Sequence, residues 1–261
     1  MYSLNDFFGV LDKIAPIKYS LMQIEQGDYD NSGILLNMHD NVARALFSLD
    51  LSVFAVNKAK RLKCDTIVTH HPAIYHPIKA LNINGDTAAV ALAAKNGLNV
   101  ISMHLNLDVA TGGIDDNLCL GLGGEKYKFL NGLDDFAHYG REFKVSGTLA
   151  EFKKRIAKTF GTQKTLVYGN LKNAVGVCAS FCGGGSEYAL SYARQGGAAD
   201  TIVTSDMPHH VLKELTERGK QVIILTHYAS ENYGFKKFYE NVKKEVAGKA
   251  ETFFFEDKRF L

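Results

Sequence analysis

The sequence predicts an α/β protein made of two similar α/β domains that arose by internal duplication. Short β-branched segments alternate with longer amphipathic segments, an order typical of α/β architecture. The segment Asp65–Thr69 (Asp-Thr-Ile-Val-Thr) recurs unchanged at Asp200–Thr204. Each copy leads through a polar loop and a helical segment to a second strand that runs into a histidine, His104 in the first half and His227 in the second. This shared order makes duplication a better explanation than chance identity.

In the first half, the alternation and the capping residues set the expected elements. Asp86 and Gly97 flank an alanine-rich segment and are typical helix caps. In order, we expect a strand over 45–51, a helix ending near 62, a strand over 65–69, a helix over 86–96, a strand over 98–103 and a helix over 114–122.

Hydrophobic periodicity is lost between 123 and 141, where Gly and Asp accumulate. We therefore expect a first domain over 1–125 and a second α/β segment over 126–261, with a linker or insert near 123–145. The second segment is expected to contain helices over 149–160, 186–195, 208–218 and 230–246, and strands over 164–168, 174–180, 200–204, 221–225 and 250–255.

The composition indicates a globular protein. The 261 residues are 46% hydrophobic and 22% charged, and the formal net charge of +2 argues against a dedicated nucleic-acid binder. No apolar run approaches the roughly 18 residues that cross a bilayer, and the first residues lack the order of a signal peptide. The four cysteines show no CxxC spacing, so we expect a cytoplasmic protein with buried, reduced thiols and no membrane partner.

Polar side chains follow two expected strands at the points where these strands end. His70 and His71 come directly after one strand, and His104 and Asp108 follow the next. Ligands of open α/β sheets bind outside the carboxyl ends of strands, and neighbouring side chains of an extended chain point in opposite directions. The two histidines therefore suit two different metal ions. A pair of surface histidines and a turn aspartate are the alternatives. We expect His104 and Asn106 to orient Asp108.

A third cluster lies in the second half. His227 and Glu231 are four residues apart, so on a helix they share one face. An ordinary surface pair has the same spacing, but His227 takes the place in the second half that His104 takes in the first. Two similar halves facing each other across a cleft would bring His70, His71, Asp108, His227 and Glu231 into one site.

These imidazoles and carboxylates suit two divalent ions, with Zn, Fe, Mn or Ni left open. Two ions about 3.5 Å apart would polarise a substrate and activate water, which is hydrolytic chemistry. Gly183–Gly185 fits either a tight turn or an anion-binding loop. His209 and His210 either line the cleft or cap a helix.

These motifs resemble the Nif-three-like family of dinuclear metal centre proteins, also labelled GTP cyclohydrolase 1 type 2. The segment Tyr29–Leu35 is similar to the family's Trp-Asp-Asn-x-Gly-Leu motif, with Tyr in place of Trp. The other matches follow in order along the chain: Leu49-Asp50, Thr69–Pro72, His104–Asp108, Gly112-Gly113, Gly183–Gly185, Asp200–Thr204 and His227–Glu231. The family's Thr-Gly-Glu motif reads Thr204-Ser205-Asp206 here, which puts the substrate in doubt.

The resemblance implies mixed sheets flanked by helices, a toroidal homohexamer and a dinuclear centre. The implied metal ligands are His70, His71, Asp108, His227 and Glu231. It also implies hydrolysis of the guanine ring of GTP with release of formate, in which His104, His209 and His210 are our candidates for proton transfer or phosphate binding. The alternative is a metal chaperone or a regulatory protein without turnover. DNA binding around a central hole is disfavoured by the near-neutral charge.

Overall fold

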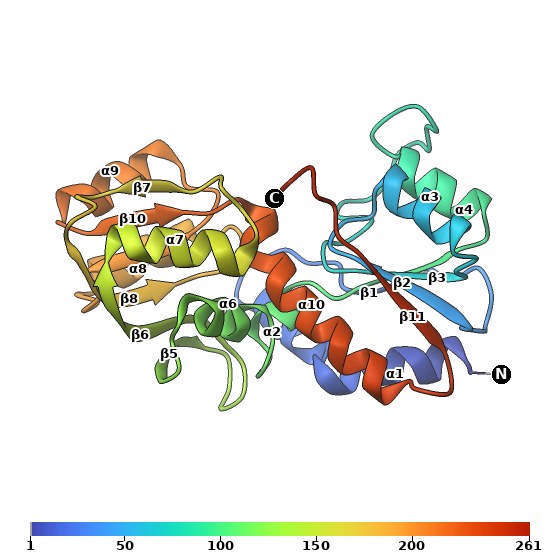
Figure 1. Cartoon of the computed structure of the whole chain (residues 1–261). Helices are drawn as coiled ribbons and strands as arrows, with labels where there is room; N and C mark the ends of the chain where they lie inside the picture. Colours follow the sequence, from blue (N-terminus) through green and yellow to red (C-terminus); the bar gives the residue numbers. More distant parts are fainter. Residues whose placement is uncertain (1) are drawn as a thin grey trace. The chain divides into compact units, whose positions relative to one another are not determined.

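The computed structural model describes residues 2–261, which divide into two compact units (Figure 1). The first unit contains the chain up to Ala110 together with Phe235–Asp257, and the second contains Thr111–Gly234 and Lys258–Leu261. Each unit is a mixed sheet flanked by helices, which confirms the predicted fold class. The sequence predicted a boundary between 125 and 126; here the first unit runs to Ala110 and also takes in Phe235–Asp257.

The sheet of the first unit has the strand order β1-β4-β3-β2-β11. Strand β1 is antiparallel to β4, and the other neighbours are parallel. Strand β11 pairs with β2, and this pairing explains why the C-terminal segment belongs here. The strands are β1 (Gly33–Leu36), β2 (Arg44–Ser48), β3 (Thr66–Thr69), β4 (Asn99–Ser102) and β11 (Glu251–Phe255).

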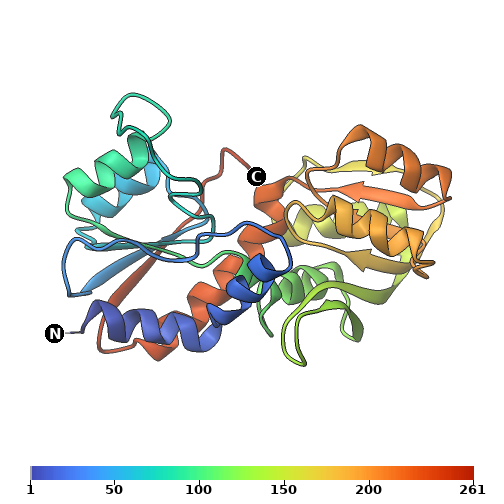
Figure 2. The ribbon, with the colours of Figure 1, turned by 180° about the vertical axis from the view of Figure 1, so that it is seen from behind.

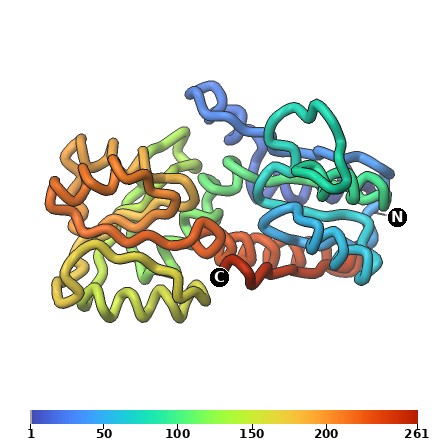
Figure 3. The backbone as a smooth tube through the Cα atoms, turned by 90° about the horizontal axis from the view of Figure 1, so that it is seen from above, coloured from blue at the N-terminus to red at the C-terminus, as the bar shows by residue number. Residues whose placement is uncertain are grey.

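Helices cover both faces of this sheet (Figure 2). On one face, α3 and α4 pack over a core that includes Leu46, Ile67 and Val100. On the other face, Phe235 and Phe238 of α10 pack against Phe47 of β2. Figure 3 shows the red C-terminal segment beside the blue and cyan segments of this unit. The helices are α1 (Leu4–Ile14), α2 (Lys18–Glu25), α3 (Val53–Arg61), α4 (Ala88–Lys95), α5 (Leu105–Val109) and the C-terminal part of α10 (His227–Glu245).

Local sequence explains most of these boundaries. The hydroxyl of Ser52 accepts the Ala55 N–H at 3.1 Å and begins α3. Asp86 does not cap α4: the N-cap residue is Thr87, whose N–H donates to the Asp86 carboxylate at 3.0 Å. The helix therefore begins two residues later than expected. Helices α1, α2 and α5 and strand β1 are additions to the expected elements.

The sheet of the second unit has the strand order β5-β6-β8-β9-β10-β7. Strands β8, β9 and β10 are parallel, and β5, β6 and β7 pair in antiparallel fashion. The β5–β6 hairpin occupies most of the stretch that the sequence predicted to be a linker or insert. The strands are β5 (Tyr127–Gly132), β6 (His138–Thr148), β7 (Leu166–Tyr168), β8 (Ala174–Ser180), β9 (Thr201–Thr204) and β10 (Gln221–Ile224).

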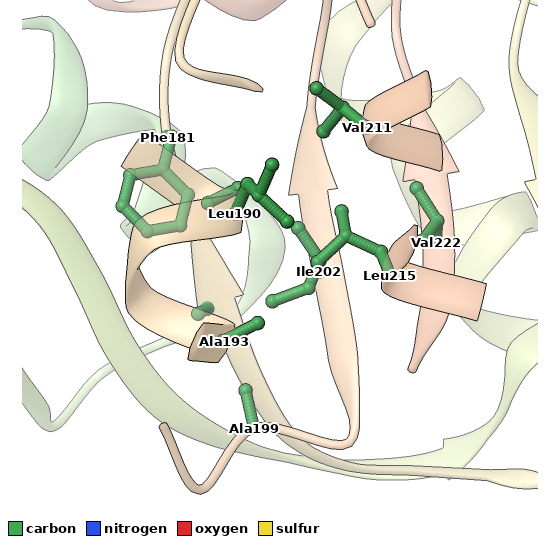
Figure 4. Close-up of a cluster of buried hydrophobic side chains, with 10 residues drawn as sticks. Phe181, Leu190, Ala193, Ala199, Ile202, Val211, Leu215 and Val222 are labelled. Carbon is green, nitrogen blue, oxygen red and sulfur yellow. The ribbon is translucent and has the colours of Figure 1, made fainter. Parts of the chain in front are cut away.

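Figure 4 shows the core on one face of this sheet, where α8 and α9 pack over Ile202 and Val222. The carboxylate of Glu214 on α9 pairs with Arg194 on α8 and with Arg218, at 2.7 and 2.9 Å. The remaining helices of the unit lie toward the opposite face (Figure 2). The helices are α6 (Ile114–Leu122), α7 (Leu149–Phe160), α8 (Ser186–Arg194), α9 (His209–Glu217) and the beginning of α10.

A buried ionic cluster joins α6 to β6 in the second unit. Arg141 is fully buried, and its Nε lies 2.7 Å from the Asp116 carboxylate. A second guanidinium nitrogen lies 3.5 Å from Asp115 and donates to the carbonyls of His138 and Gly140, both at 2.9 Å. These partners hold the charge in the core, because an unpaired buried guanidinium would be strongly unfavourable. No helix within residues 2–261 has the length and apolar character to cross a membrane.

The predicted duplication is visible in the two sheets. The series β1-β4-β3-β2 in one unit has the same spatial order, chain order and strand directions as β7-β10-β9-β8 in the other. The two repeated aspartates also make the same kind of contact, because each accepts backbone N–H groups of a neighbouring strand. The carboxylate of Asp65 accepts the N–H groups of Ala43 and Arg44 at the beginning of β2, and that of Asp200 accepts the Val177 N–H of β8.

Candidate metal centre

The first unit brings three histidine rings together at the carboxyl ends of neighbouring parallel strands. His70 and His71 follow β3, and His104 follows β4. One ring nitrogen of each lies within 4.8 Å of those of the other two. The rings of His70 and His71 have centroids 4.9 Å apart, and those of His70 and His104 are 5.2 Å apart. His70 is fully buried. The strand-end reasoning therefore placed these three residues correctly.

Each of these rings has its Nδ1 atom held by an acceptor oxygen. The acceptor is the Met103 carbonyl for His70 (2.8 Å), the Asp50 carboxylate for His71 (2.6 Å) and the Asp30 carboxylate for His104 (2.8 Å). An oxygen acceptor requires the proton on Nδ1, so the lone pair of the neutral ring lies on Nε2. Metal-binding histidines have the same arrangement, in which an oxygen acceptor holds one ring nitrogen and the other faces the ion.

Asp108 adds a buried carboxylate to this cluster. It lies on the short helix α5, and its Oδ1 is 3.4 Å from His70 Nε2. The Asn106 amide donates to the Ala15 carbonyl at 2.6 Å and its backbone N–H donates to Ser20; its expected role in orienting Asp108 stays a prediction. Asn106 therefore anchors α5 to the helices before β1.

The loop before β1 reaches the same cluster through Asp30. Besides binding His104, Asp30 accepts a hydrogen bond from the Ser32 hydroxyl at 2.6 Å, and that hydroxyl accepts the His104 N–H. Burial alone would raise the pKa of Asp30, but hydrogen bonds from His104, Ser20 and Ser32 hold it below its usual value. Asp30 is therefore an ionised acceptor that fixes the His104 ring.

The second unit holds a separate pair at the beginning of α10. His227 Nε2 lies 3.0 Å from Glu231 Oε1 one turn later, and His227 Nδ1 contacts the Asp206 carboxylate. Burial disfavours the imidazolium, but the carboxylates of Glu231 and Asp206 outweigh it and raise the pKa of His227 to about 10. Asp206 has φ of 42°, a left-handed conformation that a non-glycine residue adopts only where its surroundings enforce it.

The Gly183 backbone packs directly against this pair. A Cβ atom at Gly183 would lie 2.1 Å from Glu231 Oε1 and 3.3 Å from His227 Nε2, and its φ is 52°. The Gly183 N–H donates to the Ser230 hydroxyl at 3.1 Å, and its carbonyl accepts from Ser205. Only glycine fits this position without displacing the Glu231 carboxylate.

The buried Arg141 cluster supports the same glycine loop. Asp115, which pairs with Arg141, also accepts the N–H of Cys182 at 3.0 Å, directly before Gly183. The backbone that faces Glu231 is therefore held from both sides, by Asp115 before Gly183 and by the Ser205 and Ser230 hydroxyls at Gly183 itself.

His209 and His210 lie elsewhere in the second unit. They form the exposed first turn of α9, and His210 Nε2 lies 3.5 Å from Glu187 on α8. Within residues 2–261, neither belongs to a group of three or more side chains that could hold a metal ion. Their assignment to proton transfer or phosphate binding stays a prediction.

Three aspartates are the functional residues that the sequence reasoning did not assign. Asp30, Asp50 and Asp206 each hold the Nδ1 of one histidine. Asp50 lies at the end of an expected strand and Asp206 just after another, while Asp30 precedes the first expected element; nothing in their local pattern connects each to a particular ring. For Asp206 a partial signal exists, because the repeat aligns Ser205-Asp206 with His70-His71.

The donor chemistry fits divalent first-row ions. Imidazole nitrogens and carboxylate oxygens suit Zn²⁺, Fe²⁺, Mn²⁺ and Ni²⁺. Thiolates are typical of structural zinc sites, and the described clusters contain none. Within residues 2–261, the side chains therefore form groups able to bind a metal ion.

Comparison with known proteins identifies the family of this chain. A family model described as Duf34/NIF3 (NGG1p interacting factor 3) matches residues 2–259. The chain belongs to this family. The resemblance inferred from the motifs is thereby confirmed.

Relatives of this family carry names that refer to GTP. A protein of Clostridium perfringens named "GTP cyclohydrolase 1 type 2 homolog" is 28% identical over 251 residues, which cover 93% of this chain and 92% of the relative. A Methanocaldococcus jannaschii protein of the same name is 31% identical over 222 residues, covering 81% of this chain and 85% of the relative.

Solved structures of the family share the fold. A Bacillus cereus protein related to NIF3 matches with a TM-score of 0.86 at 16% identity, covering 98% of this chain and 97% of that one. Reduced HcgD from Methanocaldococcus jannaschii matches with a TM-score of 0.79 at 24% identity, covering 98% of each chain.

Proposed function

We propose that the protein is a dinuclear metal-dependent hydrolase that opens the guanine ring of GTP and releases formate. The proposed ligands are His70, His71 and Asp108 of the first unit and His227 and Glu231 of the second. One observation carries the proposal: all three ligand histidines have Nδ1 held by an oxygen acceptor, which leaves Nε2 as the atom for a metal ion; on His227 the ion would replace the Nε2 proton that pairs with Glu231. The names of the relatives support GTP as the substrate.

The residues take distinct roles in this proposal. When bound, two divalent ions would polarise the guanine ring and lower the pKa of water toward neutrality. We assign His104 to proton transfer rather than to metal binding: with Nδ1 held by Asp30, its Nε2 lone pair would accept a proton from the attacking water and then pass that proton to the leaving nitrogen. Asp108 and Glu231 are both buried, so bound ions would balance the charges of these two carboxylates.

The proposal includes a cytoplasmic homohexamer. Support for the location comes from the four buried cysteines, which suit a reducing compartment. The family resemblance implies the homohexamer, and size-exclusion chromatography with light scattering tests this oligomeric state directly.

The reaction is tested by incubating the protein, reconstituted with Zn²⁺, Mn²⁺ or Fe²⁺ in turn, with GTP and measuring formate. We expect formate release with at least one ion, and its loss in His70→Ala and Glu231→Gln. His39→Gln, a histidine outside both clusters, should match the wild type. Metal binding without formate release with any of the three ions would contradict the proposed hydrolase activity and favour the alternative, a metal-handling or regulatory protein.

A further inference from the structure

Three exposed aromatic rings lie together beside the histidine cluster of the first unit. Tyr29 lies in the loop before β1, and Tyr75 and His76 lie in the loop after β3. The ring centroids of Tyr29 and Tyr75 are 5.0 Å apart, those of Tyr29 and His76 are 4.6 Å apart, and those of Tyr75 and His76 are 4.8 Å apart. We call these three residues the aromatic platform.

The platform is exposed although its rings are large. Tyr29 is 46% exposed and Tyr75 is 41% exposed, and His76 is also exposed. Single exposed aromatic residues are common on protein surfaces, but a contiguous exposed group marks a binding site more often than chance would place one.

Hydrogen bonds fix the two loops that carry the platform. The Tyr75 hydroxyl donates to the Tyr29 carbonyl at 3.1 Å, and the Asn31 amide donates to the Ile74 carbonyl at 2.6 Å. The rings are therefore held in place before any ligand arrives, which lowers the entropic cost of binding one.

The platform is joined to the proposed catalytic histidine. The Tyr75 ring stands edge-on to the His104 ring, with centroids 6.2 Å apart and planes at 85°. The loop of Tyr29 also supplies Asp30, which holds His104 Nδ1 at 2.8 Å. The same short loop therefore sets both the exposed rings and the orientation of the imidazole.

We infer that the aromatic platform binds the planar heteroaromatic ring of the substrate by stacking and places it next to His104. Aromatic side chains stack on any nucleobase, because every base has a π-face. A purine on the platform would lie beside the imidazole cluster, as ring opening requires. The inference rests on the proposed function only in taking the ligand to be the substrate of the metal centre.

The test measures binding rather than turnover, with guanosine, GTP and inorganic triphosphate as separate probes in isothermal titration calorimetry. We expect Tyr29→Ala and Tyr75→Ala each to weaken guanosine and GTP binding about tenfold. Triphosphate binding and metal content, measured by elemental analysis, should not change. Tyr29→Phe retains the ring and should bind guanosine within about twofold of the wild type.

Tyr168→Ala serves as the matched control, because Tyr168 is 39% exposed on β7 of the other unit. It should leave guanosine binding unchanged. Guanosine binding that is absent from the wild type, or equal in the wild type and both alanine variants, overturns the platform. Guanosine binding that depends on the platform, without formate release, contradicts the proposed reaction and supports the platform. Formate release with an unaltered KM in both alanine variants contradicts the platform and supports the proposed reaction.

Discussion

Gly183→Ala should weaken metal binding and should also lower the stability of the fold, and the two effects can be measured independently. The added Cβ would lie 2.1 Å from Glu231 Oε1, a distance no real contact permits, so the carboxylate must swing away. Glu231 is 2% exposed and lies 3.0 Å from His227, so this movement breaks the pair. The alanine also adopts φ of 52°, which costs about 1–2 kcal/mol.

We therefore expect two effects that can be measured separately. Metal affinity should fall about 10- to 100-fold, the range seen when the support of a ligand is lost. The free energy of unfolding should fall by at least the roughly 1–2 kcal/mol of the backbone strain, and by more because the buried Glu231–His227 pair is also broken. Chelator competition measures the first effect and thermal unfolding of the metal-free protein measures the second.

Gly184→Ala is the matched control, because a Cβ at Gly184 meets nothing within 4 Å. It should change metal affinity and stability by no more than about 0.5 kcal/mol. Equal metal affinity in the wild type and both variants would refute the role given to Gly183 and to the Glu231 carboxylate.

Three further predictions follow from buried or paired groups. Arg141→Met leaves two buried aspartates without their cation and should lower the free energy of unfolding by about 3–5 kcal/mol in urea titrations; a change below 1 kcal/mol would contradict the pairing. Two arginines lower the pKa of Glu214 to about 2, so its stabilisation is present above pH 4.5 and is lost as the pH falls through 2. Glu214→Gln should therefore be less stable than the wild type at pH 7, with the difference shrinking toward pH 2. Burial raises the pKa of Cys64 to about 11 and that of Cys178 well above its ordinary value. Both thiols should resist iodoacetamide at pH 8 until the protein unfolds, and rapid labelling of the native protein would be inconsistent with their burial.

The histidine cluster could be predicted because it depends on sheet topology alone. Parallel β3 and β4 are neighbours, so whatever follows them meets at one edge. His70, His71 and His104 are placed by that rule. That rule does not place Asp30, because Asp30 lies in a loop whose path depends on the packing of α1 and α2. No local sequence pattern predicts that packing.

The β5–β6 hairpin was missed for a different physical reason. Its glycines suggested a linker, but Gly140 lies inside β6 with φ of 85°, and a Cβ there would come within 2.5 Å of the Phe181 ring. That glycine serves close packing against a neighbouring aromatic ring rather than a flexible connection. Glycine content alone does not distinguish these two uses.

The pairing of β11 with β2 bears on how the chain folds as it is synthesised. Strand β2 is made about two hundred residues before its partner, so the first unit stays incomplete until the last segment leaves the ribosome. Until then β2 presents an open edge, which is where nascent chains aggregate. The second unit has nearly all of its sequence available earlier and can be folded first. A ribosome-stalled chain that ends before 251 should therefore expose the first unit, and not the second, to proteases and chaperones.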